Sequence, residues 1–328
     1  MQGLVCDGDG IAMVKLTSAP KVFVVFGATG QQGGAVVKLL TSDPVFRKEY
    51  IVRAVVRDPT KESAVALQEL PGCEIVQADL DDKASLYPAL KDAHTAFLVT
   101  NSIFDERLYE REYAQGKNAA DVAVEVGLEY LIFSTLSSVR KISSDRFTKV
   151  WHFDVKHDIE QYIRSLPFAS AFIAMGCFMQ NLTNALKPRP VGDGTFEIAT
   201  SMSPDTRLPM IDATDVAVFV AAILRDPEAL QGRNLHAAAE LRRVEELAEI
   251  VSSVSGRITW YRQLPETDFR AVLEGMNPFF AEDSTEMLGY YEDFGYFGPD
   301  MEKLIQPSVN RDYGTLRSVE EFVKELEF

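Results

Sequence analysis

Residues 21–33 read KVFVVFGATGQQG, and this stretch decides the fold. Residues 22–26 are all apolar, β-branched or aromatic, as in a strand that is buried on both faces of a sheet. Glycines follow at once, and residues 35–40 then continue as an apolar helix. A strand, a glycine-rich turn and a helix in this order are typical of a dinucleotide-binding unit.

Each glycine of the turn has its own task. The first, Gly27, permits the tight turn, Gly30 lets the backbone approach a pyrophosphate, and Gly33 lets the helix pack against the strand. The amide groups and the dipole at the helix start attract anionic phosphates. The alternative is a turn with a structural role alone. The cofactor-binding residues predicted here are Gly27, Thr29, Gly30, Gln31, Gln32 and Gly33.

Strands and helices alternate along the first half of the chain. Further strands are predicted at 51–56, 73–78, 95–99, 130–133 and 168–173, and the longer helices at about 106–126 and 154–165. This alternation predicts parallel strands joined by right-handed crossovers. We therefore expect an α/β fold with a Rossmann-type doubly wound parallel sheet, whose ligand lies at the carboxyl ends of the strands.

The alternation becomes irregular after residue 182. Residues 183–208 are rich in proline and glycine, and the chain from about 255 is rich in aromatic and acidic residues. We expect three parts: a flexible tail over 1–20, a dinucleotide-binding Rossmann domain over 21–182, and a smaller, partly interleaved C-terminal α/β domain over 183–328. This last domain would form a substrate site or a lid, and about 209–225 would return to the Rossmann sheet.

The end of the second predicted strand selects the nucleotide. An acidic residue there would accept a hydrogen bond from the ribose hydroxyl, whereas an arginine would pair with a 2′-phosphate. The chain has Arg57, with Lys61 one turn later. This pair predicts NADP(H) as the cofactor. The alternative is that Arg57 is a solvated cation beside Asp58.

Polar residues also end the third and fourth strands. Asp79, with Leu80 beside it, is expected to hold the adenine, and its alternative role is a helix N-cap. Thr100 and Asn101 are expected to flank the ribose and nicotinamide, and their alternative role is a simple turn.

Composition restricts the partners. The chain has 33 lysines and arginines against 49 aspartates and glutamates, a formal net charge of -16. Direct nucleic-acid binding is not expected, because it needs a basic surplus to neutralise phosphates. No apolar run approaches the roughly 18 residues of a membrane helix, and residues 1–20 do not resemble a secretory signal. The three cysteines are widely spaced, which favours free thiols without a metal. We expect a cytoplasmic protein, with the nucleus as a candidate second location.

Five segments together resemble the NmrA-like family, an atypical branch of the short-chain dehydrogenase/reductase superfamily. They are Gly27–Gly33, Arg57, Thr100-Asn101, His152–Lys156 and Gly176–Asn181. The resemblance covers about residues 20–325. It implies a catalytic set of a serine after the fifth strand and a Tyr-x-x-x-Lys pair on the next helix, in which the tyrosine exchanges a proton with the substrate.

The chain departs from this set at the tyrosine. His152 takes the tyrosine position and Lys156 the lysine position, and their spacing puts both on one helix face. The candidate serines are Ser134 and Ser137. His152 can move protons near neutral pH, but beside a lysine and a cationic nicotinamide it has little reason to be a strong acid, and a packing role fits equally. Lys156 is expected to contact the ribose or nicotinamide, or else to be a surface cation.

The resemblance also implies a substrate pocket. Phe178, Met179 and Asn181 follow the sixth strand, at the mouth of the family's substrate cleft. An aromatic ring and a thioether suit a flat apolar ligand, but they fit a protein core equally. A second Tyr-x-x-x-Lys run, Tyr113–Lys117, lies before the fifth strand, in the wrong order for catalysis.

Two functions follow from the resemblance. The first is an NADP(H)-binding regulator or redox sensor that controls protein partners such as transcription factors, which the missing tyrosine and the acidic charge favour. A homodimer is a candidate assembly for it. The alternative is an NADPH-dependent reductase of a quinone or other small aromatic substrate. The sequence thus leaves open whether the chain is an enzyme.

Overall fold

The computed structural model describes residues 19–309 and 311–326, so that residues 1–18 of the expected tail lie outside the described residues. In the described part, seven strands form one sheet in the order β11-β6-β5-β4-β1-β2-β3, and all neighbours are parallel. The strands are β1 Lys21–Val25, β2 Tyr50–Val56, β3 Cys73–Gln77, β4 Ala93–Leu98, β5 Tyr130–Thr135, β6 Ala169–Met175 and β11 Asn234–Ala237. This confirms the predicted doubly wound Rossmann-type sheet.

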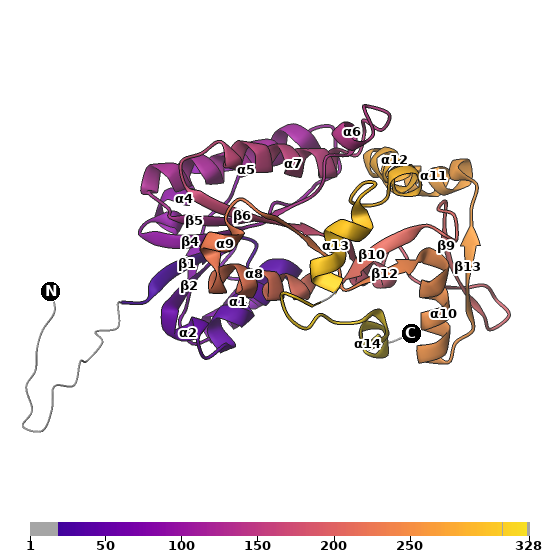
Figure 1. The fold of residues 1–328 in the computed structure, drawn as a ribbon, viewed down its shortest axis with the longest axis horizontal. Coiled ribbons are helices and arrows are strands. Elements are labelled where there is room, and N and C mark those ends of the chain that lie inside the picture. Colours follow the sequence, from indigo (N-terminus) through magenta and orange to yellow (C-terminus); the bar gives the residue numbers. More distant parts are fainter. Residues whose placement is uncertain (1–18, 310, 327–328) are drawn as a thin grey trace, which may run out of the picture.

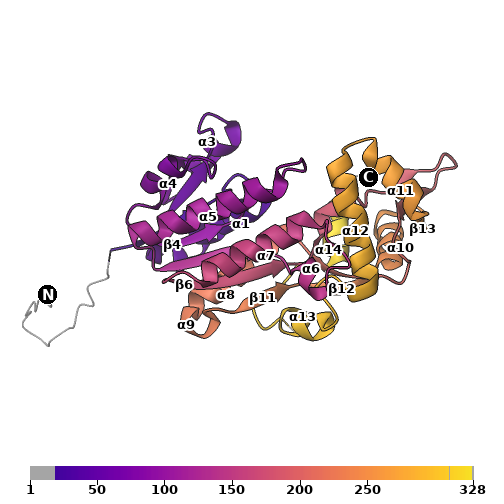
Figure 2. The same cartoon turned by 90° about the horizontal axis from the view of Figure 1, so that it is seen from above.

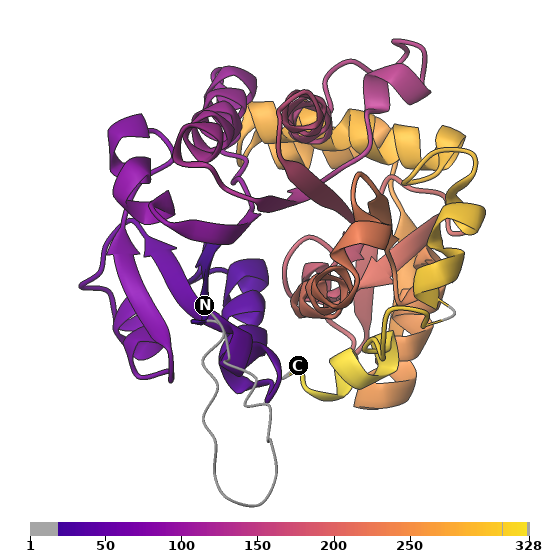
Figure 3. The same cartoon turned by 60° about the vertical axis from the view of Figure 1, so that its left-hand side comes forward.

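Helices cover both faces of this sheet (Figures 1 and 3). One face carries α1 and α8, and the other carries α4, α5 and α7. The helices of this part are α1 Gln31–Ser42, α2 Phe46–Glu49, α3 Glu62–Gln68, α4 Lys83–Leu90, α5 Leu108–Val126, α6 Val139–Ile142, α7 Trp151–Arg164, α8 Val216–Arg225 and α9 Pro227–Leu230.

The strand β1 shows why the sheet is central. Phe23 and Val25 pack into the core on one face, while Val24 packs into the core on the other. All three side chains are 0% exposed. Successive side chains of a strand point to opposite faces, so an unbroken apolar run belongs in a sheet that is covered on both sides.

A second group of elements gathers at one end of the molecule, away from α3 and α4 (Figure 2). It contains two small sheets, with strand orders β12-β10-β7 and β13-β9-β8 in the described residues. Its elements are β7 Cys177–Phe178, η1 Met179–Thr183, β8 Arg189–Pro190, β9 Phe196–Thr200, β10 Arg207–Ile211, β12 Glu240–Arg243, α10 Val244–Ser255, β13 Thr259–Gln263, α11 Glu266–Glu274, α12 Pro278–Phe294, α13 Met301–Val309 and α14 Val319–Lys324. The short helix η2 Ala213–Asp215 packs against α1 and α8 instead.

The two groups are interleaved along the chain. Helix α8, within the expected 209–225 segment, packs beside α1, and the later strand β11 adds to the edge of the large sheet beside β6. The domain boundary at residue 182 stays a prediction. No helix among the described residues has the length and apolar character needed to span a membrane.

Candidate functional site

The glycine turn lies between β1 and α1, at the carboxyl end of the central strand. Gly27 has a positive φ of 64°, which favours glycine. A Cβ atom on Gly33 would lie 2.2 Å from the carbonyl oxygen of Gly27, so α1 can approach the turn only without a side chain there. Both glycines therefore have the backbone geometry that the sequence predicted for them.

The first turn of α1 offers its amide groups to a ligand. Gly30 occupies the N-cap position, and no side chain among the described residues caps the helix there. Thr29, Gly30 and Gln31 are exposed. The unpaired amides at a helix start are the groups that bind phosphate in such turns.

Ser134 joins this turn to the end of β5. Its hydroxyl donates a hydrogen bond to Gln32 Oε1 at 2.8 Å, and the side chain is buried. The other candidate serine, Ser137, is half-buried. Ser134 therefore orients a residue of the predicted phosphate-binding turn.

Arg57 follows β2, the neighbour of β1, and Lys61 occupies the N-cap position of α3. Both side chains are exposed. The carboxylate of Asp58 accepts hydrogen bonds from the backbone amide and hydroxyl of Thr60, at 2.9 and 2.6 Å, and these bonds lower the pKa of Asp58. Asp58 is thus held by Thr60, and the exposure of Arg57 fits both a 2′-phosphate contact and a solvated cation.

The structure after β3 corrects the alternative role of Asp79 as a helix N-cap. Asp79 accepts a hydrogen bond from the amide of Asp81 at 3.0 Å, but it does not cap a helix. The N-cap of α4 is Asp82, which accepts from the amide of Ala84. Leu80 is held through its carbonyl oxygen, which accepts from Asn118 Nδ2 at 3.0 Å. Asp79 and Leu80 stay predicted adenine contacts.

Thr100, at the end of β4, is linked to Lys156 through Glu112 of α5, a residue that was not predicted from the sequence. The Lys156 ammonium donates to the Thr100 carbonyl oxygen at 3.3 Å and to its Oγ1 at 3.2 Å, and it forms an ion pair with Glu112 of α5. Thr100 and Ser102 both donate to the Glu112 carboxylate, at 2.6 and 2.7 Å. Asn101 is exposed.

Glu112 is held in its charged form. Burial alone would raise its pKa, but the Lys156 ammonium and the hydrogen bonds from Thr100 and Ser102 outweigh burial and lower the pKa. One signal of this role was present in the sequence. Leu108, Glu112 and Gly116 recur at the spacing of a buried helix face, and Glu112 is the charged member of this face.

His152 meets a second residue that the sequence analysis missed, Asp283 of α12. His152 Nδ1 lies 2.5 Å from Asp283 Oδ1, and the His152 backbone amide donates to Asp283 Oδ2 at 3.2 Å. The Asp283 side chain is 0% exposed and that of His152 is 18% exposed. Nothing in the local sequence around Asp283 indicates this contact.

Aromatic rings surround His152. The Phe104 ring lies edge-on to the His152 ring at 5.5 Å and to the Phe280 ring at 5.0 Å. Asn277, the N-cap of α12, donates from Nδ2 to the Phe104 carbonyl oxygen at 2.9 Å. The start of α12 is thereby attached to the loop that follows β4.

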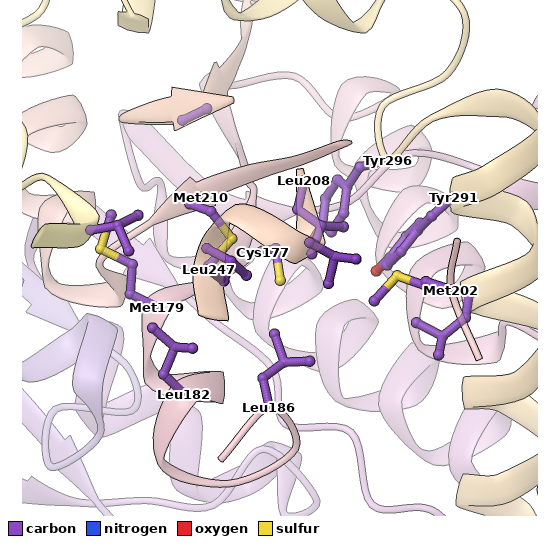
Figure 4. Packing of buried hydrophobic residues seen from close by; sticks show 14 of the residues in the cluster. Cys177, Met179, Leu182, Leu186, Met202, Leu208, Met210, Leu247, Tyr291 and Tyr296 are labelled. Atoms are coloured by element: carbon purple, nitrogen blue, oxygen red, sulfur yellow. The ribbon is translucent and has the colours of Figure 1, made fainter. Parts of the chain in front are cut away.

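The predicted pocket residues differ in their burial. Met179 is 0% exposed and packs in the core of the second group of elements, between Met210 and Leu182 in Figure 4. Its burial favours the core interpretation over a pocket contact. Phe178 and Asn181 are half-buried, and Asn181 donates from Nδ2 to Cys177 Sγ at 3.5 Å.

Within the described residues, no hydrogen bond or ion pair joins Cys73, Cys177 or the second Tyr-x-x-x-Lys run to the glycine turn, Arg57 or Lys156. Cys73 and Cys177 are free thiols, and burial raises the pKa of each to about 11. The described residues contain no group of three or more metal-ligating side chains arranged around a common point. Lys117 pairs with Asp121 of α5 at 2.7 Å and donates to the Tyr162 hydroxyl of α7 at 3.0 Å.

The parallel sheet, with the glycine turn at the carboxyl end of its central strand, defines a Rossmann-type α/β fold. The chain matches the model of the NmrA-like family over residues 19–323. It therefore belongs to the NmrA-like family, which confirms the resemblance found in the sequence.

Three known proteins illustrate this family and fold. An NmrA-like family domain-containing oxidoreductase of Aspergillus flavus is 28% identical over 299 residues, which span 85% of this chain and 86% of that protein. The structure of NmrA, a negative transcriptional regulator in complex with NAD, superposes with a TM-score of 0.78 at 23% identity, covering 94% of this chain and 96% of NmrA. The triphenylmethane reductase of Citrobacter sp., complexed with NADP(H), superposes with a TM-score of 0.70 at 20% identity. The superposition covers 93% of this chain and 99% of the reductase.

Proposed function

We propose that this chain binds NADP(H) and acts as a regulator that transmits the state of the nucleotide to a protein partner. The observation that carries the proposal is the position of α12. Asn277 attaches its start to the loop after β4, and Asp283 attaches its first turns to α7. These are the two elements that carry Thr100 and Lys156, the predicted contacts of the ribose and nicotinamide.

The nucleotide part of the proposal rests on the edge of the sheet where β1, β2 and β4 end. The free amides of α1 suit the pyrophosphate, and the exposed Arg57 and Lys61 suit a 2′-phosphate. The family relative NmrA has been crystallised with NAD and with NADP.

A bound nucleotide would act on α12 through Lys156. In the structure Lys156 is paired with Glu112 and donates to Thr100. Ribose hydroxyls at Lys156 would compete with these contacts, and a cationic oxidised nicotinamide would repel the ammonium where a neutral reduced one would not. A ligand shifts a conformational equilibrium only through such a difference in affinity. The position of α7, and of α12 packed against it, would therefore differ between the two redox forms.

The partner is expected to be a protein, such as a transcription factor, because the acidic surface disfavours nucleic acid. The negative transcriptional regulator NmrA has the same fold. The homodimer and the cytoplasmic or nuclear location stay predictions from the sequence.

Hydrogen exchange tests this proposal. Amide exchange over residues 277–294 is measured without nucleotide, with NADP+ and with NADPH, in the unmodified chain and in Asn277→Ala. We expect different protection with the two redox forms, and we expect the difference to shrink in Asn277→Ala. Equal protection of α12 with both forms, at saturating nucleotide, would contradict the regulator function.

A second function is favoured by a specific observation. His152 lies one helical turn from Lys156 and contacts the buried Asp283. Its ring lies beside the Phe104 ring, which in turn packs against Phe280. A flat aromatic substrate suits such a wall, and bound NADPH would supply the hydride. The Aspergillus flavus relative is named an oxidoreductase, and the Citrobacter protein is a reductase. The second candidate is an NADPH-dependent reductase of a quinone or other small aromatic substrate.

This candidate is tested by NADPH oxidation with a panel of quinones that includes 1,4-benzoquinone. Turnover that Lys156→Ala abolishes would support the reductase and argue against a purely regulatory protein. Absence of turnover with every quinone, in a chain that binds NADPH, would overturn it.

A further inference from the structure

The contact between His152 and Asp283 uses both oxygens of one carboxylate. Oδ2 accepts from the His152 backbone amide at 3.2 Å, and Oδ1 lies 2.5 Å from the ring nitrogen Nδ1. The backbone hydrogen bond fixes the carboxylate relative to the start of α7, so the second oxygen is placed at the ring. The ring and Oδ1 are close without the alignment of a linear hydrogen bond. A rotation of the ring would therefore align them.

One edge of the His152 ring is covered and another is open. Nδ1 has almost no solvent-accessible surface, whereas the side chain as a whole is 18% exposed. The exposed part must therefore belong to other atoms of the side chain. A carboxylate on the covered edge and solvent on the open edge are the environment of an oriented histidine that acts through its second nitrogen.

The other charged groups at this contact already have partners. On α12, Glu282 pairs with Lys149, and Glu286 accepts from the backbone amides of Thr148 and Lys149 at 2.7 and 2.8 Å. On α7, Lys156 pairs with Glu112 of α5. Asp283 is therefore the carboxylate that faces the His152 ring.

The burial of Asp283 determines which ring nitrogen carries the proton. An ionised carboxylate without exposed surface is costly unless a donor compensates it. The backbone amide compensates one oxygen, and a proton on Nδ1 compensates the other. A neutral imidazole carries a single N–H, so this contact selects the Nδ1–H form and leaves Nε2 as the nitrogen that takes up and gives the second proton.

We propose that Asp283 is the positioning residue of His152, and that His152 occupies the place of the missing tyrosine as proton donor. This inference rests on the reductase function above. A quinone takes up the hydride that NADPH loses, and the electron pair of the reduced bond collects on its oxygen. The doubly protonated His152 gives that oxygen its Nε2 proton and regains one from water, while Asp283 stabilises the charged ring.

Imidazole nitrogen NMR tests the contact without any substrate. The full chain is labelled with 15N, and His152→Gln assigns the His152 signals among the four histidines of the chain. We expect neutral His152 to carry its proton on Nδ1, and we expect Asp283→Asn to remove this preference. The matched control is Glu286→Gln, which alters another α12 carboxylate at the start of α7 and should leave the tautomer unchanged.

Kinetics test the role of the contact. Asp283→Asn should lower kcat for quinone reduction by about 10- to 100-fold, which is only part of the roughly 100- to 10,000-fold contribution of a positioned general acid, because the imidazole itself remains. The affinity for NADPH should change less than about twofold. Asp283→Glu should restore part of kcat, and Glu286→Gln should retain it.

The two possible failures are distinguishable. No quinone turnover by the unmodified chain would overturn the reductase function. Turnover without an Nδ1 proton on His152, or an Asp283→Asn chain with unchanged kcat, would overturn the assignment of Asp283 and leave the reductase function intact.

Discussion

Lys156 and Glu112 form an ion pair across α7 and α5 in which the lysine side chain is 13% exposed and the glutamate side chain 1% exposed. The pair lies at the carboxyl end of β4, where Thr100 and Ser102 also donate hydrogen bonds to the carboxylate. A buried pair of this kind contributes little net stability when intact, but removal of one partner leaves an uncompensated charge.

Glu112→Gln should therefore destabilise the chain and release Lys156 from the ion pair. We expect the free energy of unfolding in urea to fall by about 3 kcal/mol, because the Lys156 ammonium loses its counter-ion. The same change should tighten binding of NADP+, since Lys156 no longer has to leave a carboxylate to reach the ribose. Thr100→Val serves as the control because it removes one hydrogen bond and no charge. Unchanged stability in Glu112→Gln would contradict the importance of this ion pair.

Gly33→Ala tests the glycine turn. The new Cβ would lie 2.2 Å from the Gly27 carbonyl oxygen, so α1 must shift away from β1. We expect a loss of roughly 1–3 kcal/mol in stability and a large loss of nucleotide affinity. The matched control is Gly34→Ala, whose Cβ would lie at an ordinary 3.4 Å from Ala28 O. Alanine favours a helix over glycine by about 1 kcal/mol, so the control should bind nucleotide and unfold at the same or a higher urea concentration.

Asp215 gives the stability a pH dependence. Burial, with repulsion from Asp212, raises the pKa of Asp215 to about 6 from 3.8. The folded chain therefore holds this proton more tightly than the unfolded chain, and Asp215 destabilises the fold progressively as the pH rises from about 4 to about 6, by roughly 3 kcal/mol in total. Asp215→Asn should remove this loss while keeping an acceptor for the amide of Arg317. Parallel urea-denaturation stabilities of the two chains between about pH 4 and pH 7 would contradict the raised pKa.

The sequence predicted those parts of the site that lie within one short segment. The glycine turn and the pair His152 and Lys156 are local patterns, because a turn needs its glycines in order and a helix places residues four apart on one face. The charged residue on the buried face of α5 was a usable signal for Glu112.

The rest depends on contacts that spacing does not encode. Asp283 is 131 positions from His152 and meets it only because α12 packs onto α7. A methionine suits a pocket and a core alike, so that only the burial of Met179 distinguishes the two. Among neighbouring aspartates after β3, hydrogen bonding selects Asp82 as the helix cap, and the residue type alone could not.

The central claim is that the edge formed by the turn and Arg57 binds NADP(H), and calorimetry tests it most directly. Binding of NADP+ and NAD+ is measured with the unmodified chain and with Arg57→Ala. We predict that Arg57→Ala weakens NADP+ binding by about 10- to 100-fold, the loss of a charge-assisted phosphate contact worth roughly 1.5–3 kcal/mol, and changes NAD+ binding little. No heat with either nucleotide, or an equal loss for both, would contradict the claim.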